Sequence, residues 1–265
     1  MDKDRLTRLA KNPNLIEGIH NYCDRWCERC AFTAKCLNYA IHQEEFPGAD
    51  SRDTSNSEYW TRLAGFFHEM VQMVREDAAE RGINVDAIDK EILAEDKEIT
   101  ARAENHPCCE DSREYARTVN AWFDSAGDLF SDKKDELTSA ALMDLPGGDP
   151  VAAAQALNDA VDVIRWYQHQ IYVKLIRAVR GMMRDSADIE YMPDDSNGSA
   201  KVALVGMDRS IGAWGILYDA FDERHDEILD VLVSLDRLRK KTERYFPEAR
   251  CFVRPGLDET GQSSE

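Results

Sequence analysis

Apolar residues recur at steps of three and four along most of this chain, and this periodicity restricts its fold more than any other feature. The two longest patterns run from about residue 150 to 182 and from about 200 to 245. Such a spacing places the apolar side chains on one face of an α-helix. The apolar stretch 202–207 is compatible with a short strand, but no second alternating run is present to pair with it. The sequence therefore predicts an all-α fold, a helical bundle around two long C-terminal helices.

Shorter helical patterns precede these two. They cover residues 59–82, 84–105 and 107–130. The segment 144–150 contains two Pro and two Gly and marks a linker, and its last two residues, Asp and Pro, are a typical helix start. The first of these patterns predicts an amphipathic helix, whose apolar face is formed by Trp60, Leu63, Phe67, Met70, Val74 and Ala78.

The charge of the chain limits the partners that we expect. It carries 33 basic and 51 acidic side chains, a net charge of −18, and such a field repels nucleic acid and anionic lipid. No apolar run approaches the roughly 20 residues that cross a bilayer, and residues 1–14 are too polar for a signal peptide. We expect a cytoplasmic protein that binds neither nucleic acid nor membranes. A protein partner is compatible with the charge, and nothing in the sequence indicates the oligomeric state.

The strongest motif is a cluster of cysteines. The chain has seven, and Cys23, Cys27, Cys30 and Cys36 lie within 14 residues in a C-x3-C-x2-C-x5-C spacing. Since a reducing compartment disfavours disulfides, we interpret these thiols first as metal ligands. If the first part of this cysteine segment is helical, Cys23, Cys27 and Cys30 share one helical face. A turn near Thr33 would then bring Cys36 back toward them. Four thiolates suit zinc or an iron-sulfur cluster, and three basic residues can offset their charge: Arg25, Arg29 and Lys35.

A local resemblance favours iron over zinc. Residues 27–36, CERCAFTAKC, resemble the C-x2-C-x5-C element that holds 4Fe-4S clusters in RecB-like nucleases and in SPASM domains. The resemblance implies a 4Fe-4S cofactor and covers these ten residues alone, and no family is indicated for the whole chain. Cys23, Cys27 and Cys30 also share the C-x3-C-x2-C spacing of radical S-adenosylmethionine enzymes, whose βα barrel would require strands that the sequence does not predict. Structural zinc and thiols without a metal remain the alternatives.

Two further groups of residues are weaker candidates. His106, Cys108 and Cys109 place two thiols at a helix start, either as reactive groups or as small apolar fillers. Fragments of the Glu-x-x-His pattern of di-metal bundles also occur. The alternative for those fragments is a set of salt bridges and hydrogen-bonded histidines. The residues of this possible second metal site are His68, Glu69, Asp162, His169, Asp222 and His225.

These observations lead to one principal prediction and two alternatives. We expect a Cys-rich metal-binding helical hairpin over residues 1–50, a helical bundle over 51–254 and a disordered tail over 255–265. The principal prediction is a metal-binding protein with one four-cysteine centre, 4Fe-4S or else zinc, in a structural or a redox and sensing role. The alternatives are a ferritin-like metallo-oxidoreductase that uses the second site and a zinc-stabilised scaffold for protein interactions. No phosphate-binding loop, nucleophile elbow or His-Glu-x-x-His motif is present.

Overall fold

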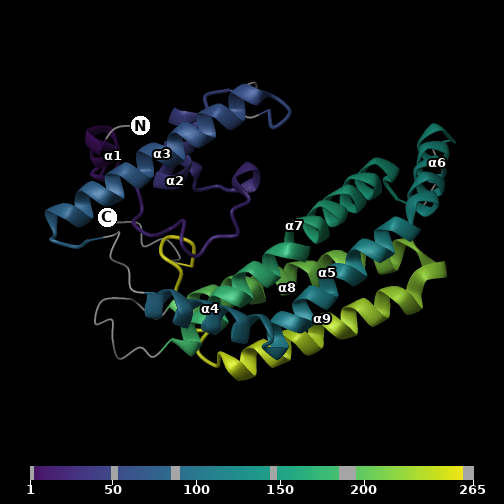
Figure 1. Cartoon of the computed structure of the whole chain (residues 1–265). Coiled ribbons are helices and arrows are strands. Elements are labelled where there is room, and N and C mark those ends of the chain that lie inside the picture. Colours follow the sequence, from purple (N-terminus) through teal and green to yellow (C-terminus); the bar gives the residue numbers. More distant parts are fainter. Residues whose placement is uncertain (1–2, 49–52, 85–89, 144–147, 185–194, 259–265) are drawn as a thin grey trace, which may run out of the picture. The chain divides into compact units, whose positions relative to one another are not determined.

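The computed structural model describes residues 3–48, 53–84, 90–143, 148–184 and 195–258. Within these ranges the regular secondary structure is helical and contains no strand (Figure 1). The predicted all-α fold is therefore confirmed. Residues 202–207 lie inside α8 (Asp195–Ala220), so the strand alternative for them is wrong.

The chain divides into two compact units. The first, called here the cysteine unit, comprises Met1–Lys97 and Val253–Glu265, and the second, the bundle unit, comprises Glu98–Phe252. The boundary falls inside α4 (Lys90–Glu104). The contacts thus group residues 51–97 with the cysteine segment, whereas the sequence pattern assigned them to the bundle.

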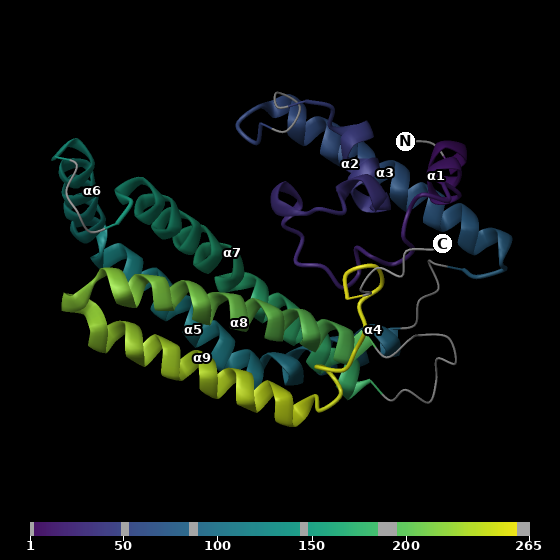
Figure 2. The ribbon, with the colours of Figure 1, turned by 180° about the vertical axis from the view of Figure 1, so that it is seen from behind.

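The bundle unit is built from four long helices that run alongside one another (Figures 1 and 2). The helix α7 (Pro150–Met183) packs on α8 and α5 (Pro107–Ser125), while α9 (His225–Tyr245) packs on α8 and α5. The largest buried side chains come from all four helices, and Trp214 Nε1 donates a hydrogen bond of 3.2 Å to the Tyr115 hydroxyl between them. The core includes Tyr115, Ile164, Tyr167, Leu175, Met207, Trp214, Ile228 and Leu235.

Local sequence signals set several helix ends. Asp149 accepts hydrogen bonds from the backbone N–H groups of Val151 and Ala152, and Pro150 occupies the first turn, so α7 begins where the sequence predicts. Residues 144–147 of the predicted linker lie outside the described part of the chain.

Two long patterns are interrupted in ways that periodicity does not show. The pattern 107–130 divides into α5 and α6 (Gly127–Met143). The pattern 200–245 divides into α8 and α9, joined by a short 3₁₀ turn, Asp222–Arg224. At this corner a His225 ring nitrogen lies 2.8 Å from the carbonyl oxygen of Tyr218, and the two rings stack. The apolar period continues through the corner because α8 and α9 each bury an apolar face.

The cysteine unit contains α1 (Lys3–Ala10), α2 (Leu37–Glu45) and α3 (Ser57–Glu80). The helix predicted over residues 59–82 corresponds to α3. None of its residues is fully buried. Periodicity shows that a helix is amphipathic but not what covers it. Residues 255–258, predicted as the start of a disordered tail, form a turn in which Arg254 donates hydrogen bonds to Asp258. Residues 259–265 lie outside the described ranges. No helix in the part that the structure describes is both long and apolar enough to cross a membrane.

Candidate metal centre

The cysteine segment folds through turns and not through the α-helix that would place Cys23, Cys27 and Cys30 on one face. Asp24 Oδ1 accepts a hydrogen bond of 3.2 Å from the backbone N–H of Trp26, which closes a tight turn. The residue between them, Arg25, has a φ of +58°, which no α-helix can contain. Two 3₁₀ turns follow, Cys27–Arg29 and Thr33–Lys35.

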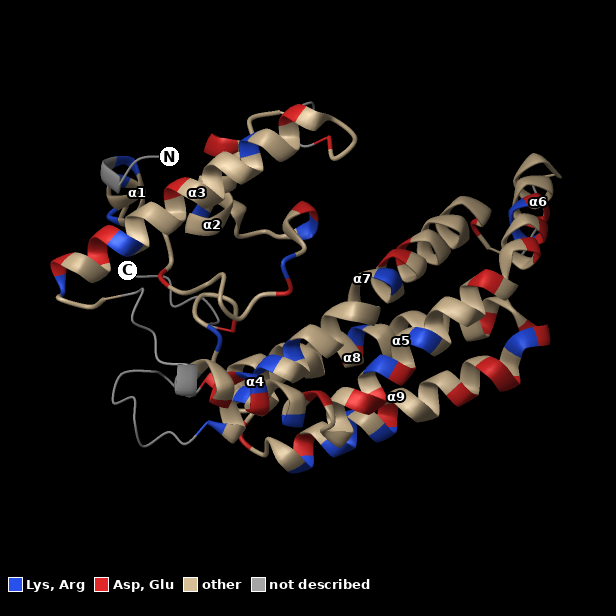
Figure 3. Cartoon of the chain, in the orientation of Figure 1, with Lys and Arg blue, Asp and Glu red and all other residues tan. Residues whose placement is uncertain are grey.

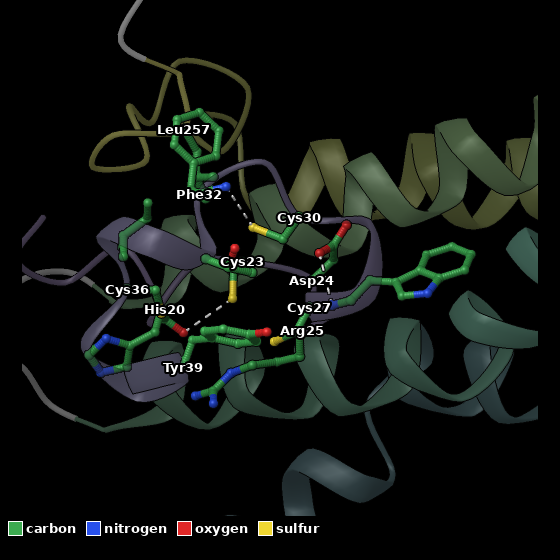
Figure 4. A pocket seen from close by; sticks show the side chains of 13 residues that line it. His20, Cys23, Asp24, Arg25, Cys27, Cys30, Phe32, Cys36, Tyr39 and Leu257 are labelled. Atoms are coloured by element: carbon green, nitrogen blue, oxygen red, sulfur yellow. Dashed lines mark hydrogen bonds between the residues drawn. The ribbon is translucent and has the colours of Figure 1, made fainter. Parts of the chain in front are cut away.

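These turns nevertheless bring all four cysteines of the motif to one pocket (Figure 4). The pocket has about 340 Å³ of space, part of which is open to solvent. The structure thus gathers the predicted ligands by a route other than a shared helical face. The remaining lining is largely apolar and aromatic, and it includes Ile19, Trp26, Phe32, Tyr39 and Leu257.

The thiols are free and influence one another electrostatically. Burial raises the pKa of the Cys27 thiol, and the neighbouring Cys23 and Cys36 raise it further because adjacent thiolates repel. Cys23 Sγ donates to the His20 carbonyl oxygen at 3.5 Å, whereas Cys30 Sγ accepts from the backbone N–H of Phe32 at 3.4 Å. A metal bound among the four sulfur atoms would supply the positive charge that offsets the repulsion between thiolates.

Basic groups lie at the same place. Arg25 lines the pocket, and the Arg29 guanidinium lies 4.1 Å from the centre of the Trp26 ring. His20 also lines the pocket; burial, and then the charge of Arg25, lowers its pKa, so its imidazole is neutral at pH 7. Its Nδ1 is buried without a hydrogen-bond partner among the described residues. The pocket therefore combines four thiols, one imidazole and positive charge.

The sulfur atoms line the pocket without converging on one point. Among the described residues, no group of three or more His, Cys, Asp or Glu side chains is placed so that it could hold a metal ion. A single zinc ion needs four ligands within about 2.0–2.3 Å of it. The four thiols have the chemistry of ligands for thiolate-bound metals.

The C-terminal segment completes the pocket, which sequence reasoning missed. Leu257 contributes to the lining, and Gly256, with a φ of +67°, lies so close to Ile16 that a Cβ atom would stand 2.7 Å from Ile16 Cδ1. The backbone N–H of Ile16 in turn donates to the carbonyl oxygen of Lys35 at 2.9 Å. No motif connects residue 257 with residues 23–36, so no sequence signal could have assigned it to the site.

The second cysteine pair is part of the core of the bundle unit. Cys108 and Cys109 are fully buried, and burial raises their pKa values to about 11 and about 12. His106 Nδ1 accepts a hydrogen bond of 3.2 Å from the backbone N–H of Cys108 and so caps α5. Protonated, buried thiols are poor nucleophiles, so the structure favours the interpretation as apolar fillers.

The six candidates for a second metal site are divided between the two units. His68 and Glu69 are exposed on α3 in the cysteine unit, and Asp162 and His169 are exposed on α7 in the bundle unit. Asp222 and His225 contact each other at 3.4 Å at the corner between α8 and α9. His225 is already bound to the Tyr218 carbonyl there, which agrees with the structural alternative of hydrogen-bonded histidines.

Comparisons with protein-family models, with characterised proteins and with solved structures found no significant match to this chain. The function of the chain is therefore inferred from the four-cysteine pocket.

Proposed function

We propose that the chain is a metal-binding protein whose four-cysteine pocket binds a 4Fe-4S cluster through Cys23, Cys27, Cys30 and Cys36. The observation that supports this most is that all four residues of the motif line one pocket although they are spread over three turns. The other three cysteines, Cys108, Cys109 and Cys251, do not line this pocket.

We propose a cluster in preference to a single zinc ion because residues 27–36 have the C-x2-C-x5-C spacing that resembles known 4Fe-4S elements. Such a cluster would be held by the four thiolates of the pocket and would supply its own iron and sulfide. The N–H group of Phe32, which donates to Cys30 Sγ, is the kind of donor that stabilises cluster sulfur.

Other residues of the pocket have defined tasks in this proposal. Ile19, Phe32 and Leu257 keep water from the site, and Arg25 offsets the negative charge of the thiolates. The cluster, when bound, supplies a one-electron couple for transfer or sensing and a cross-link that stabilises the unit. A cytoplasmic location belongs to the proposal, because a reducing compartment keeps the thiols available.

The test is purification without oxygen, followed by measurement of iron, sulfide and zinc and by a visible absorption spectrum. We expect about four iron and four sulfide per chain and a broad brown absorption that dithionite bleaches. Cys27→Ser should lose the iron, because it removes one of four ligands. Cys251→Ser is the matched control, since Cys251 is exposed and lies outside the pocket.

Two results would contradict the cluster. About one zinc per chain, lost in Cys27→Ser, would turn the site into a structural zinc centre and favour the interaction scaffold. Metal that is retained equally by Cys27→Ser and Cys251→Ser would show that the motif is not the ligand set.

A further inference from the structure

The helix α3 carries an apolar stripe on its exposed side. Its residues follow one another at steps of four, three, four, three and four, which is the spacing of a coiled-coil seam. Large members remain uncovered, with exposed fractions of 56% for Trp60, 59% for Phe67 and Val74, and 51% for Val71. The centre of α3 is correspondingly poor in charge (Figure 3). This set, called here the α3 stripe, consists of Trp60, Ala64, Phe67, Val71, Val74 and Ala78. Its last member, Ala78, is half-buried, and the other five are exposed.

The α3 stripe is additional to the face by which α3 packs on its own unit. A second, half-buried row with the same spacing consists of Tyr59, Leu63, Phe66, Met70 and Met73. In that row the Tyr59 ring lies 5.6 Å from the ring of Phe46, which follows α2. Arg62 donates to the Glu45 carbonyl oxygen at 3.1 Å. These contacts with residues 45 and 46 lie beside the second row and leave the large side chains of the α3 stripe exposed.

The largest residue of the α3 stripe, Trp60, is fixed by local contacts although more than half of its surface is exposed. The Trp60 indole Nε1 donates a hydrogen bond of 2.8 Å to the Thr54 carbonyl oxygen, and its ring packs edge-on against Tyr59. Its polar atom is thus satisfied while more than half of its surface stays exposed. A fixed, exposed Trp loses little conformational entropy when a partner covers it, and such residues dominate interface energies.

We propose that a second copy of this chain packs on the α3 stripe, with the two α3 helices antiparallel about a two-fold axis near Glu69. In that register Trp60 lies over Ala78 of the second copy, Phe67 over Val71, and Ala64 over Val74. Each pair sets a larger side chain against a smaller one, so the stripe is complementary to itself when reversed. A parallel pair would instead place Trp60 against Trp60 and Ala78 against Ala78.

The area of the stripe predicts a weak dimer. Each aromatic side chain buries about 150–250 Å² when covered, so the exposed parts of the two aromatic residues and two valines present on the order of 300–400 Å² per copy. In two copies these four side chains together contribute about 600–800 Å², which is less than the roughly 1,200 Å² at which stable specific interfaces begin, so the dimer is weak. We expect a Kd on the order of tens of micromolar. Because each copy carries a charge of −18, added salt should strengthen the dimer by screening the repulsion.

Sedimentation velocity of the full chain at about 1 to 200 μM, at low and high NaCl, tests the proposal. We expect a concentration-dependent shift from monomer to dimer that is larger at high salt. Phe67→Glu should raise the Kd at least about tenfold. Gln72→Glu is the matched control, because it adds the same charge to the polar side of α3 and should change the Kd little.

A size swap tests the register. Ala78→Trp alone should weaken the dimer by placing two indoles against each other, and the double variant Trp60→Ala with Ala78→Trp should restore it. Circular dichroism of each variant verifies that α3 still folds. A chain that stays monomeric throughout the concentration range, as expected if another segment or a different protein covers the stripe, would overturn the proposal. A double variant as weak as Ala78→Trp would overturn the antiparallel register.

Discussion

Replacement of Gly206 by alanine should destabilise the bundle unit, although the same change at Gly212 on the same helix should stabilise it. A Cβ atom at Gly206 would lie 2.8 Å from Cδ1 of Tyr167 and 3.3 Å from Cγ1 of Ile171, whereas nothing lies within 4 Å of one at Gly212. Tyr167 cannot easily move aside, because it is fully buried and its hydroxyl accepts a hydrogen bond from Arg209.

The change in the free energy of unfolding follows from two opposing contributions. Alanine in place of glycine in a helix gains about 0.5–1 kcal/mol at either position. Overpacking a dense core costs about 1–3 kcal/mol, and only Gly206 incurs this cost. Gly212→Ala should therefore gain about 0.5–1 kcal/mol, and Gly206→Ala should lose up to about 2 kcal/mol.

Urea denaturation of both variants, followed by the fluorescence of the buried tryptophans and by circular dichroism, measures these differences. The dependence on urea concentration should remain unchanged, so that the midpoints report stability. If Gly206→Ala proved as stabilising as Gly212→Ala, the close approach of α7 and α8 at Gly206 would be refuted.

Three further predictions concern the bundle unit. Tyr115→Phe should cost about 1–3 kcal/mol in urea denaturation, because it leaves the buried Trp214 N–H without its acceptor. An unchanged urea midpoint in Tyr115→Phe, with its α-helical content intact, would contradict this loss of stability. A thiol reagent at pH 8 should modify Cys251 rapidly but Cys108 and Cys109 only after unfolding, as mass spectrometry of digested peptides can show. Since burial raises their pKa values from 9.0 to about 11 and about 12, the unfolded chain releases protons first, and stability should fall as the pH rises from 9 through those values. A urea midpoint that stays constant from pH 8 to pH 11 would contradict the raised pKa values of Cys108 and Cys109.

Much of the bundle unit could be predicted because its signals are local. The cap at Asp149 and the apolar period of α7 need no information from elsewhere in the chain, and both are observed. The division between α8 and α9 could not be predicted from that period, because two helices with the same kind of buried face continue one pattern. The corner depends on the contact of His225 with the end of α8.

The candidate metal centre was predictable in its residues but not in its construction. The spacing of Cys23, Cys27, Cys30 and Cys36 indicated a common site, and one pocket contains all four. The expected helical face was wrong, because Arg25 adopts a positive φ that ends any helix between the first two cysteines. A positive φ at a non-glycine residue is imposed by its surroundings and carries no sequence signature.

The sequence by itself determined that the chain is helical, where several helices begin and which thiols belong together, since helix period, caps and ligand spacing are properties of neighbouring residues. Only the tertiary structure decided that Leu257 lines the pocket of Cys23 and that the large residues of the α3 stripe lie exposed while the neighbouring row is half-buried. The physical reason is that every amphipathic segment offers an apolar face, whereas the choice of what covers it depends on contacts between residues far apart in the chain.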